Sequence, residues 1–209
     1  MREYPKINTV FKRTSDGRKL IEGEYSQPEF EYLKNNEWVF TEKVDGTNIR
    51  VMWDGEKITF GGKTDRAQIP ATLFAWLQGF FLNRDDDYFA TTFQGCCACL
   101  YGEGYGAGIQ KAGKLYLPDG PEFVLFDVKV EEWWLERVNV EDVAAKLGLR
   151  TVPIIGRGTL PVMIDLVKTG LQSVWGEFRA EGIVARPAIE LTQRNGSRII
   201  TKLKHRDFK

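Results

Sequence analysis

The sequence has few of the residues from which disulfide-rich, zinc-binding or membrane-spanning proteins are built. Its 209 residues include three cysteines, all between Cys96 and Cys99, and one histidine, His205. Cysteines this close together form no disulfide framework, which predicts a reduced, cytoplasmic protein, and one imidazole excludes sites that need several. No apolar run approaches the roughly 20 residues that span a bilayer, and no apolar stretch follows the first charged residues, as it would in a secretory signal. We therefore expect a protein with no membrane partner.

An excess of charge of one sign is also missing, because 29 Lys and Arg residues balance 29 Asp and Glu residues. This balance excludes a strongly basic protein that coats nucleic acid, but it allows a local basic groove. The sequence shows no repeat, low-complexity tract or Pro/Ser-rich linker. With 43% apolar residues, it is long enough for one well-buried core, and we expect a single domain over residues 1–209 with no separate C-terminal domain. We interpret the acidic run at residues 85–87 as a solvated loop.

Short apolar runs separated by some of the 21 glycines predict many strands with tight connections. Strands are expected over residues 38–42, 48–53, 57–60, 100–102, 123–130, 182–186 and 198–204, with turns at Asp54-Gly55 and Asn195-Gly196. Helices are expected over residues 70–82, 139–147 (with Asn139 as the N-cap) and 160–169, the last two ending at Gly148 and Gly170. Mixed strands and helices without a regular βαβ rhythm favour an α+β fold with antiparallel sheets.

The segment with the most chemical information is residues 41–48, with the sequence TEKVDGTN, between two expected strands. Lys43 is therefore at the end of a strand, where catalytic groups are commonly displayed, and Gly46 allows a tight turn or the close approach of a ligand. On its own, the segment is equally well explained as an Asp-Gly surface turn. Lys202 and Lys204 have two explanations as well: they point to one face of a strand, which is also typical of a solvated edge strand.

Five segments occur in the order that is typical of covalent nucleotidyltransferases, the superfamily of ATP-dependent ligases and mRNA capping enzymes. They resemble motifs I, III, IIIa, IV and V and are Lys43-Val44-Asp45-Gly46, Leu100-Tyr101-Gly102-Glu103, Phe123-Val124-Leu125-Phe126-Asp127, Glu181-Gly182-Ile183-Val184-Ala185-Arg186 and Ile200-Thr201-Lys202-Leu203-Lys204. Three more segments resemble the nick-sealing RNA ligases typified by the second RNA ligase of a T-even bacteriophage, namely Thr47-Asn48, Gly106-Ala107-Gly108-Ile109-Gln110-Lys111 and Lys204-His205-Arg206-Asp207-Phe208. The resemblance covers nearly the whole chain.

The resemblance implies a nucleotidyltransferase (ATP-grasp-like) domain with two antiparallel sheets flanked by helices, and a reaction in three steps. A lysine attacks the α-phosphate of ATP and forms lysyl-AMP, the AMP passes to the 5′-phosphate of an RNA, and a 3′-hydroxyl displaces the AMP. The nucleophile must be a neutral amine. An exposed lysine titrates near 10.4, so fewer than about one in a thousand is neutral at pH 7, and burial or nearby positive charge is needed to favour the neutral form.

The resemblance also implies roles for individual residues. Lys43 is the nucleophile, and Lys202 and Lys204 lie beside the triphosphate, where they supply positive charge. Glu103 contacts the ribose, and Glu181 and Glu103 help to hold Mg²⁺ or Mn²⁺. Each glutamate is alternatively a surface charge at the end of a strand.

Further contacts follow from the same resemblance. Phe126 is the stacking partner of adenine or, nearly as well, a core residue of its own strand. The remaining residues implied to contact the nucleotide are Glu42, Asn48 and Lys63. Gln110 and Lys111 are implied to contact RNA, and Lys6 and Arg50 are further candidates for that role.

The implied partner is RNA with 5′-phosphate and 3′-hydroxyl ends in a duplex, in the cytoplasm of a bacterial cell or a phage-infected host. Relatives usually carry a C-terminal module after motif V, whereas five residues follow Lys204 here. We therefore expect an accessory protein that grips RNA, and self-adenylylation as the better supported activity. Three alternatives stay open: a DNA ligase, a capping-type nucleotidyltransferase, and a non-catalytic module that binds nucleotide or RNA ends.

Overall fold

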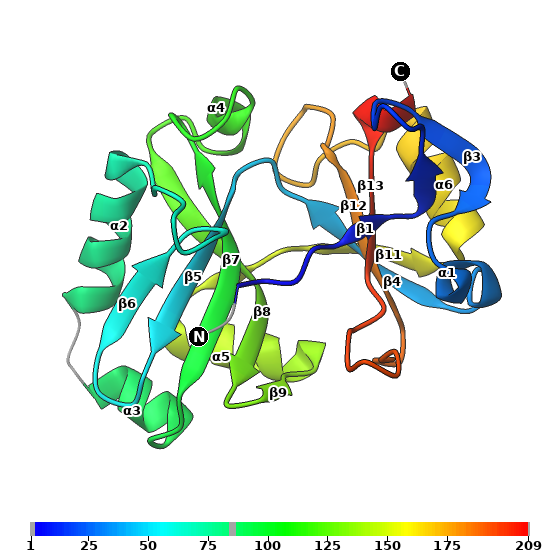
Figure 1. Ribbon diagram of the computed structural model, residues 1–209. Helices are drawn as coiled ribbons and strands as arrows, with labels where there is room; N and C mark the ends of the chain where they lie inside the picture. Colours follow the sequence, from blue (N-terminus) through cyan, green and yellow to red (C-terminus); the bar gives the residue numbers. More distant parts are fainter. Residues whose placement is uncertain (1–2, 84–86, 209) are drawn as a thin grey trace. The chain divides into compact units, whose positions relative to one another are not determined.

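The structure is a computed structural model that describes residues 3–83 and 87–208 (Figure 1). The chain divides into two compact units, each with its own sheet and core: unit 1 comprises residues 1–5 and 45–152, and unit 2 comprises residues 6–44 and 153–209. Two residues of the expected acidic loop, Asp85 and Asp86, lie outside the described residues. Across the described ranges, no helix combines the length and the apolar character needed to cross a membrane.

Unit 1 is built on a sheet with the strand order β10-β8-β7-β5-β6, and β9 pairs with β8. The strands are β5 (Thr47–Trp53), β6 (Ile58–Gly61), β7 (Ala98–Gly106), β8 (Pro121–Val130), β9 (Trp133–Trp134) and β10 (Arg150–Thr151). The pairs are antiparallel except for β10, which runs parallel to β8. Short turns join β5 to β6 and β8 to β9, the connection that antiparallel pairs allow, whereas helices lie in the longer connections between β6 and β7 and between β9 and β10.

Helices cover one face of this sheet (Figure 1). They are α2 (Ala71–Leu82), α3 (Asp87–Phe93) and α5 (Arg137–Leu147), while α4 (Gly113–Tyr116) is a single turn. Leu73, Leu77 and Phe81 recur at the spacing of one helix face and are buried against strand residues such as Ile49 and Val51. Because side chains alternate along a strand, the even-numbered residues of β5, including Asn48, are left for the other face.

Gly102 of β7 packs so closely that a side chain does not fit. A Cβ there would lie 2.3 Å from the ring of Phe123 and 2.4 Å from the Val124 carbonyl oxygen. We expect Gly102→Ala to lower the free energy of unfolding by about 1–3 kcal/mol, measured by urea unfolding. The matched control is Gly79→Ala on α2, where nothing lies within 4 Å of the added Cβ, and which should stabilise by about 0.5–1 kcal/mol. Equal stability of the two variants would contradict the packing at Gly102.

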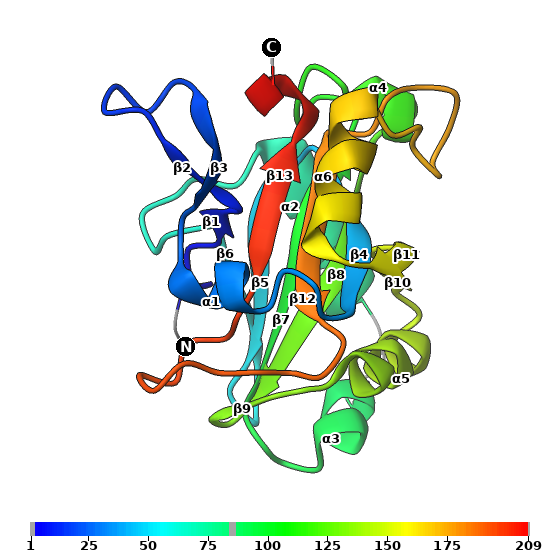
Figure 2. The same ribbon diagram turned by 90° about the vertical axis from the view of Figure 1, so that its right-hand side faces the viewer.

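Unit 2 contains a sheet with the strand order β1-β13-β12-β4-β11 and a separate hairpin of β2 and β3 (Figure 2). The elements are β1 (Asn8–Thr9), β2 (Phe11–Arg13), β3 (Leu20–Tyr25), α1 (Pro28–Tyr32), β4 (Trp38–Lys43), β11 (Ile154–Gly158), α6 (Leu160–Thr169), β12 (Gly182–Pro187), β13 (Thr201–Lys204) and the 3₁₀ helix η1 (His205–Phe208). The sheet is antiparallel except for β1, which runs parallel to β13.

Helix α6 covers one face of the unit 2 sheet (Figure 2). Its buried residues Leu160, Met163, Ile164 and Val167 follow the helical period and belong to one apolar cluster with residues of β4, β12 and β13. On β4, every second residue from Trp38 is buried. Lys43 therefore belongs to the face of β4 that α6 does not cover.

The expected α+β class with antiparallel sheets flanked by helices is confirmed. The helix expected from Asn139 instead begins at Arg137, with Glu136 as the residue before it; the sequence pattern concealed this because Val138 is an exposed apolar residue. Gly148 does end that helix in the left-handed conformation, at φ 67°. The parallel strands β1 and β10 and the β2–β3 hairpin were not expected. Strands β1, β2 and β10 are too short for a periodic signal, and β3 does not alternate between buried and exposed residues.

Candidate active site

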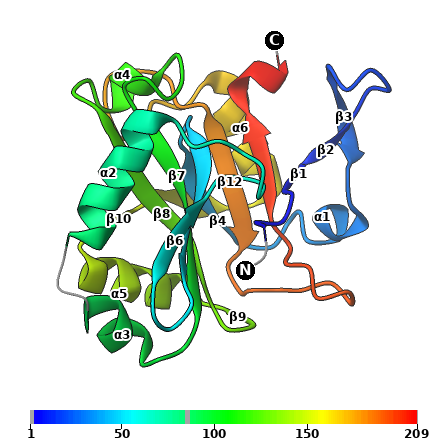
Figure 3. The same cartoon turned by 60° about the vertical axis from the view of Figure 1, so that its left-hand side comes forward.

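Three strand ends meet at one edge of the unit 2 sheet. Strand β12 lies between β4 and β13 and is antiparallel to both (Figure 3). Its first residue, Gly182, is the register partner of Lys43 on one side and of Lys204 on the other. Because residues directly opposite each other on paired strands share a face, the two lysines point to the same side. Glu181, immediately before β12, lies between them.

Glu181 binds both lysines through its carboxylate. One oxygen, Oε2, lies 2.5 Å from the Nζ of Lys43, and Oε1 lies 2.6 Å from the Nζ of Lys204. The side chains of Lys43, Glu181 and Lys204 are only 19%, 12% and 18% exposed, so these contacts are shielded from water and are stronger than surface ion pairs. The sequence predicted these residues for one site, and within unit 2 the structure brings them together.

The two ammonium groups set the charge state of Glu181. Burial by itself raises the pKa of this carboxyl group, but the charge of Lys43 and the hydrogen bonds from Lys204 and Lys43 act in the opposite direction and prevail. The pKa of Glu181 is therefore lower than its ordinary value of 4.5. Glu181 is ionised at neutral pH and is a weak base.

This lowered pKa predicts a loss of stability in acid. A carboxyl group with a depressed pKa in the folded state stabilises the fold above its unfolded-state pKa, and that stabilisation is lost as the pH falls. We expect the difference in unfolding free energy between the wild type and Glu181→Gln to be constant above about pH 5 and to shrink below 4.5. Urea unfolding across this pH range measures it, and a difference that does not change with pH would contradict the paired carboxylate.

Lys202 lies two residues before Lys204 on β13 and therefore points to the same face of the sheet. It is the register partner of Val184, which in turn pairs with Thr41. The intervening residues Thr201 and Leu203 are fully buried, whereas Lys202 is half-buried. The row formed by Lys43, Lys204 and Lys202 brings three lysines to the face of the sheet where Glu181 pairs with two of them.

The sequence predicted that Glu42 contacts the nucleotide. In the structure, its side chain lies on the face of β4 opposite that of Lys43. Its side chain is 1% exposed; Oε1 accepts a hydrogen bond of 2.6 Å from the Ser173 hydroxyl, and Oε2 accepts one of 2.9 Å from the Val174 amide. Burial raises the pKa of Glu42, and the hydrogen bonds from Ser173 and Val174 partly offset this. The structure therefore does not bring the Glu42 side chain together with the lysines.

In unit 1, the predicted residues Asn48 and Glu103 are direct register partners on β5 and β7 and share the face that the helices leave open. The Oδ1 atom of Asn48 is buried and has no hydrogen-bond partner among the described residues. A Cβ on Gly46 would lie 2.7 Å from Cγ of Glu103, so the motif I turn packs against motif III. Such an unsatisfied acceptor next to a carboxylate suits a ligand with hydroxyl or amino donors.

Phe126 is the extra residue of a β-bulge. Along β8, Asp127 pairs with Tyr101 and Leu125 pairs with the next residue, Gly102, so Phe126 has no partner on β7. A bulge redirects the side chain it carries. The Phe126 ring lies outside the apolar cluster of unit 1 and meets the edge of Tyr4, with ring centres 5.0 Å apart and planes at 74°. The Phe126 ring is therefore half-exposed and does not belong to that core.

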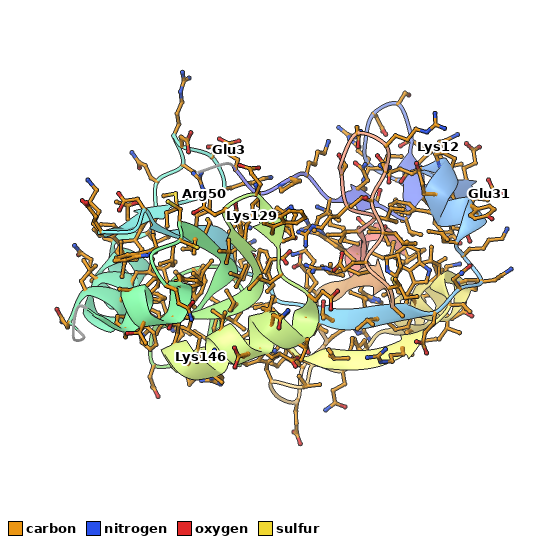
Figure 4. All side chains as sticks on the ribbon, turned by 90° about the horizontal axis from the view of Figure 1, so that it is seen from below. Glu3, Lys12, Glu31, Arg50, Lys129 and Lys146 are labelled. Carbon is orange, nitrogen blue, oxygen red and sulfur yellow. The ribbon has the colours of Figure 1, made fainter. Side chains whose placement is uncertain are left out.

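The other predicted contacts of unit 1 are exposed: Lys63, Gln110 and Lys111. Gln110 donates a hydrogen bond of 3.1 Å to the Gly46 carbonyl oxygen, which ties its loop to motif I. The prediction that Arg50 contacts RNA is wrong, since its side chain is 1% exposed. Its guanidinium instead binds the Gly62 carbonyl oxygen at 2.9 Å and Asp65 at 2.7 Å, holding the loop that carries Lys63; Figure 4 labels Arg50 on this unit.

Comparison with known proteins identifies the family. A family model described as RNA ligase matches residues 36–204. The chain belongs to the RNA ligase family. Among solved structures, a mutant of Naegleria gruberi RNA ligase with AMP and Mn is similar, with a TM-score of 0.66 and 18% identity over 97% of this chain and 57% of that chain. An apo mutant of the same ligase has a TM-score of 0.67 and 18% identity, over 99% and 58% of the two chains.

These matches show that this family member shares its fold with the Naegleria gruberi enzyme. The chain spans about 57% of the length of that ligase. The matched range of the RNA ligase model includes the predicted motifs from Lys43 to Lys204.

A divalent ion at the candidate site would find few protein ligands. Within residues 3–83 and 87–208, no group of three or more His, Cys, Asp or Glu side chains is arranged to hold a metal. Glu181 offers hard carboxylate oxygens of the kind Mg²⁺ and Mn²⁺ prefer, but both are already bound by ammonium groups. Glu181 would hold such an ion only as a single protein ligand, so a divalent ion at this site would need most of its ligands from nucleotide phosphates.

Sequence reasoning missed Ser173, Tyr4 and the structural role of Arg50. Ser173 stands in an irregular segment that carries no motif, and only the buried Glu42 reveals its partner. The Tyr4 hydroxyl donates a hydrogen bond of 2.7 Å to Asp127, the residue after Phe126; a contact over 123 residues leaves no local signal. Arg50 follows the alternation of β5 onto the same face as Asn48, a pattern that was readable in the sequence.

Proposed function

We propose that this member of the RNA ligase family is an ATP-dependent RNA ligase that works through a lysyl-AMP intermediate on Lys43. The observation that carries the proposal is the partly buried row of Lys43, Glu181 and Lys204, where the ends of three strands meet. A lysine with two further lysines on its face is suited to bind a polyphosphate and to react with it. The solved Naegleria gruberi ligase structures with ATP and Mn support ATP as its substrate and a divalent ion as its cofactor.

In the first step, Nζ of Lys43 forms a bond to the α-phosphorus of ATP, and the bond to pyrophosphate breaks. The Lys43 ammonium must first release a proton to water and leave its 2.5 Å contact with Glu181. Lys204 and Lys202 bind the phosphates and neutralise charge that develops on the leaving pyrophosphate. Glu181 would be the residue that holds a divalent ion, which would supply further positive charge for the same purpose.

The nucleoside requires contacts of a different kind, and unit 1 offers them on one face. Asn48 presents an unsatisfied buried acceptor, Glu103 is its register partner, and the Phe126 ring is half-exposed. We propose the carboxylate for the ribose hydroxyls and the ring for stacking on adenine. Lys63 is proposed for the phosphates because its loop is fixed by buried Arg50.

The later steps transfer AMP to an RNA 5′-phosphate and join it to a 3′-hydroxyl. The proposed substrate is a pair of RNA ends held in a duplex, and Gln110 and Lys111 are the proposed RNA contacts. We propose that the reaction takes place in the cytoplasm. The balanced charge of the chain, 29 basic against 29 acidic residues, gives a modest electrostatic affinity for RNA. This supports an accessory protein that grips the RNA.

The decisive experiment is self-labelling. We expect the protein to become labelled by α-labelled ATP with Mg²⁺ or Mn²⁺, through a bond that acid breaks and alkali does not, as for a phosphoramidate. Labelled GTP should give no label, and nicked duplex RNA should be sealed in preference to nicked DNA. Label from GTP would favour a capping-type enzyme, preference for DNA a DNA ligase, and no label with either nucleotide a non-catalytic binding module.

A further inference from the structure

The loop that leads into Glu181 is hydrogen-bonded to two residues that adjoin the site lysines in sequence, Glu42 and His205. This loop, residues 171–180, connects α6 with the start of β12 and is closed by hydrogen bonds from the Ala180 amide to Leu171 and from the Ser173 amide to Phe178. We call it the Ser173 loop. It is anchored to Glu42, the residue before Lys43, through Ser173 and Val174.

The second anchor involves His205, the residue after Lys204. Its Nδ1 lies 2.9 Å from the Val167 carbonyl oxygen, and its Nε2 lies 2.9 Å from the guanidinium of Arg179 in the Ser173 loop. Because a carbonyl only accepts, Nδ1 carries the proton and Nε2 accepts from Arg179. The His205 amide also donates to the Glu181 carbonyl oxygen at 2.9 Å. The loop is thus tied to both lysine-bearing strands just before it delivers Glu181.

The Glu42 carboxylate is buried, and no cationic side chain is paired with it among the described residues. It is 1% exposed, its register partner Ile183 is fully buried, and no salt bridge to Glu42 occurs in the described part of the chain. Burial of a carboxylate without a cation is unfavourable, and hydrogen bonds offset this only in part. Glu42 therefore contributes little net stability, and the effect of its two hydrogen bonds is to fix the orientation of its side chain.

The hydrogen bonds of Glu42 hold the C-terminal end of β4 in place. The Ser173 hydroxyl donates to Glu42 at 2.6 Å and at the same time accepts from the Trp175 amide at 3.1 Å, so its own orientation is set. Adjacent residues of a strand point to opposite faces. A Glu42 side chain clamped on one face therefore holds the backbone from which Lys43 projects on the other.

We propose that Ser173 is a positioning residue, which acts through Glu42 and the Ser173 loop to align Lys43 and Glu181 for attack on ATP. This rests on the proposed function, because the reaction that is aligned is the adenylylation of Lys43. Ser173 itself contacts neither the lysines nor Glu181 through its side chain hydroxyl. It should affect the rate of the chemical step and leave the affinity for ATP nearly unchanged.

The test compares single-turnover labelling by ATP in Ser173→Ala, Ser173→Thr and the wild type. We expect Ser173→Ala to lower the maximal labelling rate at least about tenfold, since a hydrogen bond to a buried carboxylate is lost. The ATP concentration at half-maximal rate should change less than about twofold. Ser173→Thr retains the hydroxyl and should recover most of the rate. The control is Ser197→Ala in an exposed turn of the same unit, which should label like the wild type.

A measurement that does not depend on catalysis separates this proposal from the function itself. Acylation of Lys43 by an amine-reactive ester, followed by mass spectrometry, reports the exposure and orientation of the amine without ATP. We expect its rate to change in Ser173→Ala relative to that of Lys57, an exposed lysine of unit 1, and to be restored in Ser173→Thr. If the wild type does not label, the proposed function fails, and this comparison alone decides the positioning role.

Several results would overturn the positioning role. One is a labelling rate and a Lys43 acylation rate in Ser173→Ala that match the wild type. Another is a loss confined to the ATP concentration dependence, which would return Glu42 to the nucleotide contact that the sequence predicted. An equal loss of rate in Ser173→Ala and Ser173→Thr, with both proteins folded by circular dichroism, would show that the hydroxyl is not what matters.

Discussion

Replacement of Lys43 by arginine should abolish self-labelling, by a factor of about 1,000 or more. Arginine keeps the positive charge and the ability to pair with Glu181, so the ion pair at the sheet edge is preserved. A guanidinium is not deprotonated in proteins, and it therefore provides no neutral amine to attack phosphorus. The measurement is incorporation of label from α-labelled ATP under single-turnover conditions, together with a thermal unfolding curve that should stay close to that of the wild type.

A surface ion pair in the same unit provides the matched control. Lys12 and Glu24 lie 3.4 Å apart, with side chains 56% and 54% exposed, and Lys12→Arg should label like the wild type. The Lys43→Arg variant should still join an RNA whose 5′-phosphate already carries AMP, because that step does not use the lysine nucleophile. If Lys43→Arg still became labelled, another residue would be the nucleophile, and the proposal that Lys43 carries the AMP would be wrong.

The parts of the fold that sequence predicted are those with a repeated pattern. The apolar spacing of Leu73, Leu77 and Phe81 gave helix α2, and the alternation of Ile49, Val51 and Trp53 gave β5. These patterns extend over two or more periods, so local preference and burial agree. The short parallel strands β1 and β10, with two residues each, have no period to read, and their pairing depends on contacts far along the chain.

The candidate site divides in the same way. Lys43, Glu181 and Lys204 lie in segments that resemble motifs, and the antiparallel register of β4, β12 and β13 brings them to one sheet edge. The sequence motifs do not show which way each side chain points. The bulge that turns Phe126 away from the core arises from a register shift with β7, and Glu42 faces away from Lys43 only because β4 is a regular strand with one face under α6.

Burial also reassigns charged residues that look alike in sequence. Arg50 and Lys63 both appear as basic residues near motif I, yet Arg50 is enclosed and Lys63 is exposed. A buried guanidinium that holds Gly62 and Asp65 is a support for the loop rather than a ligand for RNA. In Figure 4, Lys146 on α5 illustrates the ordinary case; it pairs with Asp142 one turn away on the helix surface.

Glu181→Gln is expected to lower self-labelling at least about 100-fold, the second largest effect. The carboxylate is the shared partner of Lys43 and Lys204, 2.5 and 2.6 Å from their Nζ atoms. An amide has no charge to offset two partly buried ammonium groups, and its NH₂ group repels one of them. The lysines should then separate, so that the amine is no longer held beside the groups that bind phosphate.

A purely restraining role for Glu181 predicts the opposite outcome. The amine of Lys43 must leave its contact with Glu181 before it attacks, so removal of a carboxylate that only restrains it would give faster labelling. We expect alignment to outweigh this, because the attack needs the amine in line with the leaving pyrophosphate. Glu24→Gln, which removes one partner of the exposed Lys12 pair, should leave labelling unchanged. Faster labelling of Glu181→Gln than of the wild type across pH 6–9 would show that Glu181 restrains Lys43 rather than aligns it.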